Sequence, residues 1–490
     1  MTSSKSTKRA LLTSALALLM CVAMLIGTTF AWFTDTASTG VNKIVSGNLK
    51  VDIIGADSDS HIEKLNFTKA ATTDAEAGAE ILWEPGCRYL TEGFRIANKG
   101  NLALKWKAQV NTGTTTANEG NFDLLDVIDF YLVTRAADGT ETETALDEFT
   151  GNLKKTETSD VYYIKGVMQT TAGNDYQGLT LDGIGITVVA TQATYEKDSI
   201  DDQYDKDAKY PILVTTGDEL QATVSNATAP VNIVLANSIT TNNFVIPADK
   251  DVTLDLNGRT VKNAGSHTIL NKGHLTLTDS SADKSGQIIS LKGNTAALRN
   301  GDNAVCVVEG GTISRDGANG NTWHVVENFG KMTFNGGKVV LKNGNGFAIT
   351  NGWNYFDPGA STTHAVMEIN ALELDTDSSG IKNCRYGDLT VNDVTVTSTG
   401  YWALSNDYLG TAVINGGTLT SNSFKAVSNG AAMTVNGGTF DGTAGFFVQS
   451  YATSTVLNGG TFANMNVAAL SSYVGTGHTA QQSGTSVIIK

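Results

Sequence analysis

The chain has little proline, little charge and little cysteine, and each shortage limits its fold. Only 17% of the 490 residues are charged, which disfavours long helices laced with ion pairs. The 5 prolines and 51 glycines instead favour many short strands joined by tight turns. A chain of this length is too long for one compact core, so at least two domains are expected.

Four cysteines are too few and too scattered for a disulfide framework. Cys21 lies in an apolar N-terminal segment, and the other three are Cys87, Cys306 and Cys384. An odd, widely spaced set forms neither a disulfide pattern nor a paired zinc signature. We expect buried free thiols and no bound metal or other cofactor.

Positive charge is also scarce, since the net charge is −15. Phosphate contacts need patches of lysine and arginine, so nucleic acid and anionic membranes are not expected partners. Acidity of this kind suits a soluble extracellular protein.

The N-terminus has the features of a secretory signal. Lys5, Lys8 and Arg9 precede an apolar stretch from residue 10 to 27, and small residues follow. We predict a signal peptide over residues 1–31, cleaved between Ala31 and Trp32 by a signal peptidase. A retained membrane anchor is the alternative, because the apolar run is nearly long enough to span. After cleavage no membrane contact is expected.

The signal junction carries the most specific motif in the chain. The stretch 27–35 reads GTTFAWFTD, and SGNLKVD follows at 46–52. Both resemble the TasA/camelysin family of Gram-positive biofilm proteins, which are exported with a SipW-type signal peptidase. The resemblance continues weakly to about residue 195. It implies a jelly-roll-like β-sandwich over residues 32–195 and a secreted protein at the cell surface or in a biofilm matrix.

Local patterns in residues 32–195 agree with a sandwich. Apolar residues alternate from Phe94 to Trp106 on either side of an Asn-x-Gly turn, which predicts a hairpin. Residues 124–132 fit a short helix or a buried strand, and 184–190 a closing strand. Some members of the family are catalogued as metallopeptidases, but His61 is the only histidine in this region and no zinc-binding pair exists.

The family resemblance also implies self-association. An N-terminal strand, here residues 32–43, can complete the open sheet edge of a neighbouring subunit. The alternative is that this segment folds back onto its own domain. A further copy of the chain is therefore one predicted partner.

An acidic linker over residues 196–211 separates the sandwich from the second domain. Thr216 and Glu219 follow it with the spacing of a helix capping box. We predict a short helix to about Asn226 and a strand at 231–235, together capping a solenoid.

Residues 212–490 contain a repeat of about 22 residues. One polar turn recurs as Asn-Gly or a variant, and a second polar position precedes most of these by 7 to 9 residues. The predicted turn-ladder residues are Asn257, Asn335, Asn415, Asn436 and Asn458 in the first set, and Asn328, Asn383, Asn406 and Asn429 in the second. This period with three short strands predicts a right-handed parallel β-helix of about nine rungs, similar to pectate-lyase-like solenoids. The predicted fold class is therefore all-β.

The repeats lack the motifs of catalytic β-helices. Lyases need clustered aspartates with a basic residue, and hydrolases of the polygalacturonase type need paired aspartates and Gly-His-Gly. Asp375 and Asp377 lie close together, with Lys382 and Arg385 one rung away, but Gly-His-Gly is absent. The sequence therefore predicts that the chain is not an enzyme.

Aromatic residues near the second polar turn are candidates for stacking against sugars. They are Trp353, Tyr386, Trp402, Tyr408 and Tyr451. The alternative is that they only cover the rung edges. The predicted function is a secreted structural or adhesive matrix protein, and the alternative is a protein that binds or degrades extracellular polysaccharide in the manner of a lyase.

Overall fold

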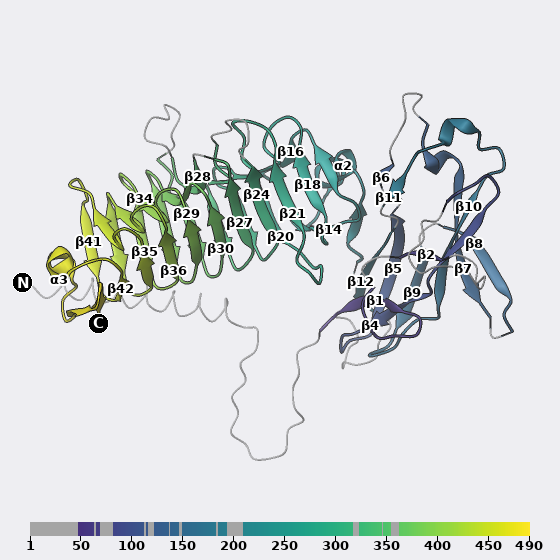
Figure 1. Ribbon diagram of the computed structural model, residues 1–490, viewed down its shortest axis with the longest axis horizontal. Coiled ribbons are helices and arrows are strands. Elements are labelled where there is room, and N and C mark those ends of the chain that lie inside the picture. Colours follow the sequence, from purple (N-terminus) through teal and green to yellow (C-terminus); the bar gives the residue numbers. More distant parts are fainter. Residues whose placement is uncertain are drawn as a thin grey trace, which may run out of the picture. The chain divides into compact units, whose positions relative to one another are not determined.

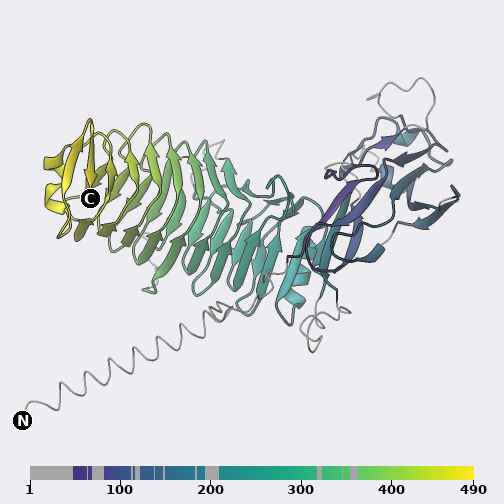
Figure 2. The ribbon, with the colours of Figure 1, turned by 90° about the horizontal axis from the view of Figure 1, so that it is seen from below.

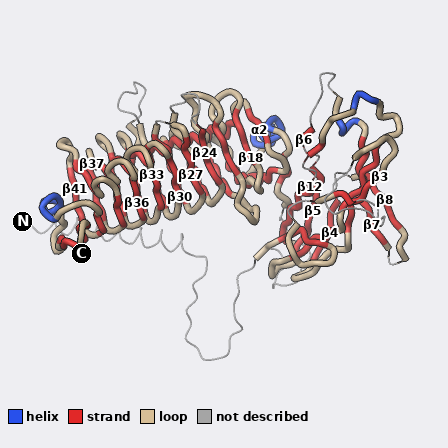
Figure 3. Tube along the Cα trace, in the orientation of Figure 1, coloured by secondary structure: helices blue, strands red, loops and turns tan. Residues whose placement is uncertain are grey.

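The computed structural model describes residues 48–490 except 63–64, 69–81, 112–113, 116–121, 137, 147–148, 183–184, 194–208, 317–322, 345 and 354–361. The signal junction at Ala31 and Trp32, strand 32–43 and most of the linker lie outside the described residues. In the described part the chain is all-β, as predicted, and its strands form antiparallel sheets followed by a parallel β-helix (Figures 1 and 3). No helix among the described residues is long and apolar enough to cross a membrane.

The N-terminal region is built from antiparallel sheets. The larger sheet contains β1 (Val51–Gly55), β2 (Phe67–Thr68), β3 (Arg88–Thr91), β4 (Phe94–Asn98), β7 (Ile128–Arg135), β8 (Glu141–Ala145) and β10 (Tyr162–Met168). Smaller sheets contain β5 (Leu104–Asn111), β9 (Phe149–Leu153) and β12 (Gly185–Gln192), and β6 (Thr114–Thr115) with β11 (Leu181–Asp182). Short 3-10 helices are η1 (Leu124–Asp126) and η2 (Asn174–Tyr176). Phe94 of the larger sheet and Leu104 and Trp106 of a smaller sheet belong to one shared hydrophobic core.

The predicted hairpin around the Asn-x-Gly turn is wrong. Strand β4 pairs with β1 and β10, whereas β5 pairs with β12 and β9, so the turn carries the chain from one sheet to the other. The Asn98 amide donates to the carbonyl oxygens of Leu102 and Lys154, at 2.7 and 3.1 Å. The Asn98 side chain thus stabilises the connection between the two sheets, although the local sequence pattern resembles that of a hairpin. The stretch 124–132 contains both structures that its pattern allowed, η1 and then β7.

Three parallel sheets form the β-helix, and each complete turn contributes one strand to each sheet (Figures 1 and 2). The eleven-stranded sheet contains β13 (Ile212–Val214), β14 (Val231–Leu235), β17 (Asp251–Asp255), β20 (His274–Thr278), β23 (Val305–Val308), β26 (Lys331–Phe334), β29 (Ala365–Ile369), β32 (Gly387–Val391), β35 (Thr411–Ile414), β38 (Ala432–Val435) and β41 (Ser454–Leu457). The parallel part of the twelve-stranded sheet contains β15 (Ile239–Thr241), β18 (Thr260–Asn263), β21 (Gln287–Ser290), β24 (Thr312–Asp316), β27 (Lys338–Lys342), β30 (Glu373–Thr376), β33 (Thr395–Ser398), β36 (Thr418–Ser421), β39 (Thr439–Asp441) and β42 (Gly460–Phe462). The nine-stranded sheet contains β16 (Phe244–Ile246), β19 (Ile269–Asn271), β22 (Leu298–Asn300), β25 (Val326–Asn328), β28 (Phe347–Asn351), β31 (Ser379–Asn383), β34 (Leu404–Asn406), β37 (Val427–Asn429) and β40 (Phe446–Val448).

The β-helix has about ten turns, one more than the sequence predicts. The additional turn is the first, β14 to β16, which carries no Asn-Gly motif and so escaped the repeat count. Alternating residues of each strand point into one continuous apolar core. Within it Phe440 and Phe462 stack with ring centroids 4.9 Å apart, as their equal spacing from the Gly-Gly turn predicts.

Both ends of the solenoid core are covered. The predicted capping helix is α2 (Gly217–Asn226), and the Thr216 hydroxyl accepts from the Glu219 amide at 3.1 Å. Leu220 and Val224 of α2 belong to the solenoid core. The other end is closed by α3 (Val467–Leu470), η3 (Ser471–Tyr473) and the antiparallel pair β43 (Ala480–Ser483) and β44 (Ser486–Ile489).

Candidate functional site

The outward face of the nine-stranded sheet concentrates charged and aromatic side chains. Its strands are short, and the turns on both sides vary in length from one rung to the next. The strand register places one central residue of each strand in a single row: Val245, Leu270, Arg299, Glu327, Thr350, Lys382, Ser405, Ser428 and Phe447. Because side chains alternate across a strand and the flanking residues point inward, this row forms the outer face.

Two ion pairs lie along this row. Arg299 Nη1 is 3.0 Å from Glu327 Oε2, and Lys382 Nζ is 3.2 Å from Asp407 Oδ2. The Glu327 side chain is only 4% exposed, and burial raises the pKa of its carboxyl group, while Arg299 acts in the opposite direction. The row is thus a polar surface with one buried and one accessible ion pair.

An aromatic cluster covers the C-terminal end of the row. Trp402 contacts Phe424 with ring centroids 4.6 Å apart and lies nearly parallel to Phe447 at 6.1 Å. The Lys425 ammonium lies 3.4 Å from the centre of the Phe447 ring. No acidic partner of Lys425 occurs among the described residues. The cluster therefore presents flat apolar rings next to a cation.

Three tyrosines stand exposed at the margins of the same sheet. Tyr401 precedes β34, Tyr408 follows it and Tyr451 follows β40, with exposed fractions of 55, 46 and 55%. A Cβ atom added at Gly430 would lie 2.7 Å from the Tyr451 ring, so the ring rests on bare backbone. Partial burial raises the pKa of the Tyr451 hydroxyl, and the nearby Asp407 carboxylate raises it further.

The five aromatic residues proposed for sugar stacking differ in their surroundings. Tyr408 and Tyr451 are exposed, and Trp402 is half-buried in the aromatic cluster. Trp353 is only 8% exposed and packs on Phe329 with centroids 4.5 Å apart. Tyr386 is half-buried and adopts a left-handed φ of 58°. Of the five, only Tyr408 and Tyr451 are exposed.

The polar-turn residues form two hydrogen-bonded ladders. Amides of the second set point into the solenoid and bond from turn to turn at 2.7 to 2.9 Å, through Asn271, Asn300, Asn328, Asn351, Asn383, Asn406 and Asn429. Amides of the first set bond on the outside at 2.7 to 3.0 Å, through Asn335, Asn370, Asn392, Asn415, Asn436 and Asn458. Asn257 instead donates to the Leu235 carbonyl at 3.0 Å.

The acidic pair noted in the sequence does not join the charged row. Asp375 is paired with Lys342 at 2.8 Å on the twelve-stranded sheet, and Asp377 accepts from the Asn343 amide at 2.6 Å. Among the described residues no group of three His, Cys, Asp or Glu side chains is arranged to hold a metal ion. Cys87, Cys306 and Cys384 form no disulfide, and burial raises the pKa of the Cys306 thiol to about 12.

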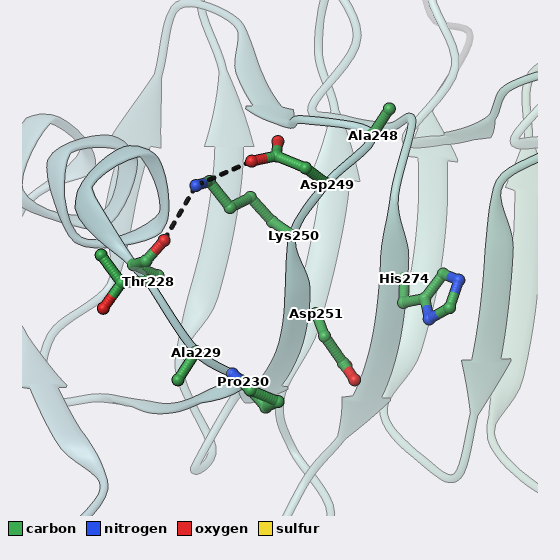
Figure 4. Close-up of a pocket in the computed structure, with 9 residues that line it drawn as sticks. Thr228, Ala229, Pro230, Ala248, Asp249, Lys250, Asp251 and His274 are labelled. Atoms are coloured by element: carbon green, nitrogen blue, oxygen red, sulfur yellow. Dashed lines mark hydrogen bonds and ion pairs between the residues drawn. The ribbon is translucent and has the colours of Figure 1, made fainter.

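A hollow in the described surface lies near the first turns of the solenoid (Figure 4). It has a volume of about 580 Å³ and is lined by the loop before β14, the loop before β17 and His274. Lys250 dominates it and is held by Asp249 at 3.0 Å and by the Ala227 carbonyl at 2.8 Å (Figure 4). Because the Lys250 ammonium group already bonds to these two partners, the hollow offers a ligand fewer free polar groups than the nine-stranded sheet does.

Comparisons with known proteins give little direct information. No family model and no curated protein matches the chain. Among solved structures, it is similar to the catalytic domain of a GH87 alpha-1,3-glucanase in complex with tetrasaccharides, with 11% identity over 84% of this chain and 96% of that chain and a TM-score of 0.15.

This neighbour corrects one prediction. The sequence prediction that the chain is not an enzyme is wrong on this finding, because the neighbour is a catalytic domain. The absence of Gly-His-Gly and of paired aspartates argues only against hydrolases of the polygalacturonase type. The prediction wrongly extended this argument to every kind of catalysis. At this TM-score the likeness assigns no active-site residue and no substrate.

Proposed function

We propose that the protein binds a polysaccharide along the outward face of the nine-stranded sheet. The observation that carries this proposal is the gathering of three exposed tyrosines at the margins of this sheet with the Trp402–Phe447 cluster at the C-terminal end of its outward row. Sugar rings present flat apolar faces that stack on aromatic side chains, and their hydroxyl groups need polar partners nearby. The charged row supplies such partners, since the Lys382–Asp407 pair lies beside Tyr451.

A linear polymer suits this surface better than a small ligand. The row repeats once per turn, at roughly 4.8 Å, the spacing between neighbouring strands. A chain lying along the solenoid would meet a new side chain at each turn, whereas a small molecule would need a deep pocket.

The structural or adhesive role predicted first from the sequence has no support in the described part of the chain. Export through the signal segment remains a prediction.

Affinity electrophoresis of the full chain tests the proposal. Native gels contain a neutral β-glucan, an α-glucan, alginate or polygalacturonate, and at least one is expected to retard the protein. The double variant Tyr408→Ala/Tyr451→Ala should weaken that binding about tenfold, because two stacking faces are lost. Leu291→Ala is the matched control, since Leu291 is an equally exposed apolar residue at 58% and lies several turns away.

Two results would contradict the proposal. One is unretarded migration in every gel. The other is an equal loss of polysaccharide binding in the double variant and in Leu291→Ala, because it would show that binding does not depend on the two tyrosines. Circular dichroism of each variant checks that the β-structure is intact.

A further inference from the structure

A cation lies among aromatic rings at the C-terminal end of the outward row. The Lys425 ammonium is 3.4 Å from the centre of the Phe447 ring. The ring centres of Trp402 and Phe424 are each 5.8 Å from the same ammonium. A cation within about 6 Å of a ring centre is attracted by the negative face of the ring. We call these three rings together with Lys425 the cation cage.

Three consecutive turns build the cation cage. Trp402 lies in the turn before β34, Phe424 in the turn before β37, and Phe447 in the middle of β40. The Trp402 and Phe424 rings are nearly perpendicular, at 81°, whereas the Trp402 and Phe447 rings are nearly parallel, at 26°. The ammonium thus meets rings of two orientations. All four residues are half-buried, so part of the cation cage stays open to solvent.

The rings hold Lys425 without help from a carboxylate. Its ammonium has no acidic partner among the described residues. The lysine side chain has a flexible four-carbon stem, so its ammonium can leave the rings for solvent without moving the backbone. Another cation that enters the cation cage restores the contacts that Lys425 gives up. Lys425 therefore occupies a cation site from which it can be exchanged.

Charge favours a cationic ligand at this position. The net charge of the chain is −15, which attracts positively charged polymers and repels negatively charged ones. The Asp407 carboxylate, 37% exposed, lies beside the same row, where it pairs with Lys382. An anion over the rings would face the negative side of each ring quadrupole. The aromatic faces and the net charge thus select the same sign of ligand.

We propose that the polysaccharide bound along the nine-stranded sheet carries free amino groups, and that the cation cage binds one of them in place of Lys425. This inference rests on the proposed function, because it names the class of polymer for the same face. A protonated amino sugar offers the same ammonium group as lysine, attached to a ring whose apolar face stacks on aromatic side chains. The cation cage therefore determines which polysaccharide is preferred.

The cation cage is continuous with the exposed stacking surface. Tyr401, which is 55% exposed, contacts Phe424 with ring centroids 5.9 Å apart. Tyr451 follows β40, the strand that carries Phe447. A polymer that stacks on these tyrosines therefore brings its amino groups next to the cation cage.

Affinity electrophoresis of the full chain in two matched polymers tests the inference. Glycol chitosan carries free amino groups, and glycol chitin has the same backbone with neutral acetamido groups. At about pH 5.5, where the amines are protonated, the wild type should bind glycol chitosan about tenfold more tightly than glycol chitin. The ratio of the two affinities is the readout, so a loss common to both polymers does not affect it.

Two variants should move this ratio in opposite directions. Trp402→Leu should remove most of the preference, because leucine keeps apolar contacts but offers no ring face. Lys425→Met should raise the preference about threefold, because methionine has a similar length and removes the competing charge. Leu291→Ala is the matched control for Trp402→Leu, since it alters an exposed apolar residue without changing the net charge. Its ratio should equal that of the wild type.

The outcomes separate the inference from the proposed function. A preference that survives in Trp402→Leu would overturn the inference, because net charge alone would then explain it. An unchanged or lower preference in Lys425→Met would also overturn it, since no exchange with Lys425 would take place. Equal binding of both polymers by the wild type would overturn it and leave the proposed function standing. No retardation by these or the other polysaccharides would instead contradict the proposed function itself.

Discussion

The two asparagine ladders differ in burial, although both repeat once per turn. Asn383 of the inner ladder is fully buried, whereas Asn415 of the outer ladder is exposed. In the inner ladder each amide donates to the next turn, and in the outer ladder it donates to the preceding one. The inner amides also bond to backbone carbonyl groups, so they satisfy polar atoms that water cannot reach.

This difference shows that sequence spacing alone does not set the energetic weight of a repeat. A hydrogen bond exposed to water exchanges with bonds to solvent and contributes little, whereas removing one partner of a buried bond leaves the other partner unsatisfied. The inner ladder should therefore hold the solenoid together, and the outer ladder should mainly shape its turns. Variants at equivalent positions of the two ladders can measure their contributions to stability separately.

The largest effect is expected from Asn383→Ala. The Asn383 amide donates to the Gly387 and Thr411 carbonyls and to Asn406 Oδ1, at 2.9, 3.0 and 2.8 Å, and accepts from Asn351 at 2.9 Å. Its loss leaves several buried groups without partners, which should cost about 4 kcal/mol. Denaturant unfolding followed by circular dichroism measures this loss. A change below about 1 kcal/mol would contradict the role given to the inner ladder.

A second effect of burial is expected at His324. Burial lowers the pKa of His324 from 6.5 to about 4, helped by Lys382 and Arg315, while a backbone bond to Phe347 acts in the opposite direction. The unfolded chain therefore binds this proton more readily, and stability is lost as the pH falls from about 6.5 to 4. Linkage gives a loss of up to about 3 kcal/mol. His324→Gln should remove that part of the pH dependence, as measured by unfolding at pH 7 and pH 4.

The same pH range contains an opposing contribution from Glu327. Burial raises the pKa of this carboxyl group, so its ionisation costs stability as the pH rises from about 4.5. The slope of the wild type alone is thus ambiguous, and the difference between wild type and His324→Gln is the decisive quantity. His274→Gln, at an exposed position, is the control. Identical slopes in all three proteins would show that burial at His324 has no such effect.

The solenoid could be predicted from the sequence because its information is local. Each turn contacts the next, so the Asn-Gly period and the alternation within three short strands define most of the fold. The capping helix was equally local, from Thr216 to Asn226. The wrong hairpin shows the limit, because β5 pairs with strands far along the chain and no local pattern encodes that choice.

The candidate sites were predictable only in part. Tyr408 and Tyr451 directly follow polar turn residues, so they could be chosen as candidates from the sequence. The cation cage joins side chains from three consecutive turns, and of its rings only Trp402 was a candidate from the sequence. Trp353 was a reasonable candidate by position, but it packs on Phe329 from the neighbouring turn. Side-chain burial, unlike turn position, depends on which residues the adjacent turns contribute.

The smallest effect is expected from Asn415→Ala, which tests the other half of the ladder comparison. Asn415 donates to Asn392 at 2.7 Å and accepts from Asn436 at 2.8 Å, and its exposed position lets water replace both bonds. The expected loss is about 0.5 to 1 kcal/mol, measured under the conditions used for Asn383→Ala. The adjacent Gly417, with φ of 98°, keeps the turn conformation in both proteins. A loss as large as that of Asn383→Ala would mean that the two ladders stabilise the solenoid equally, and that burial is not the property that separates them.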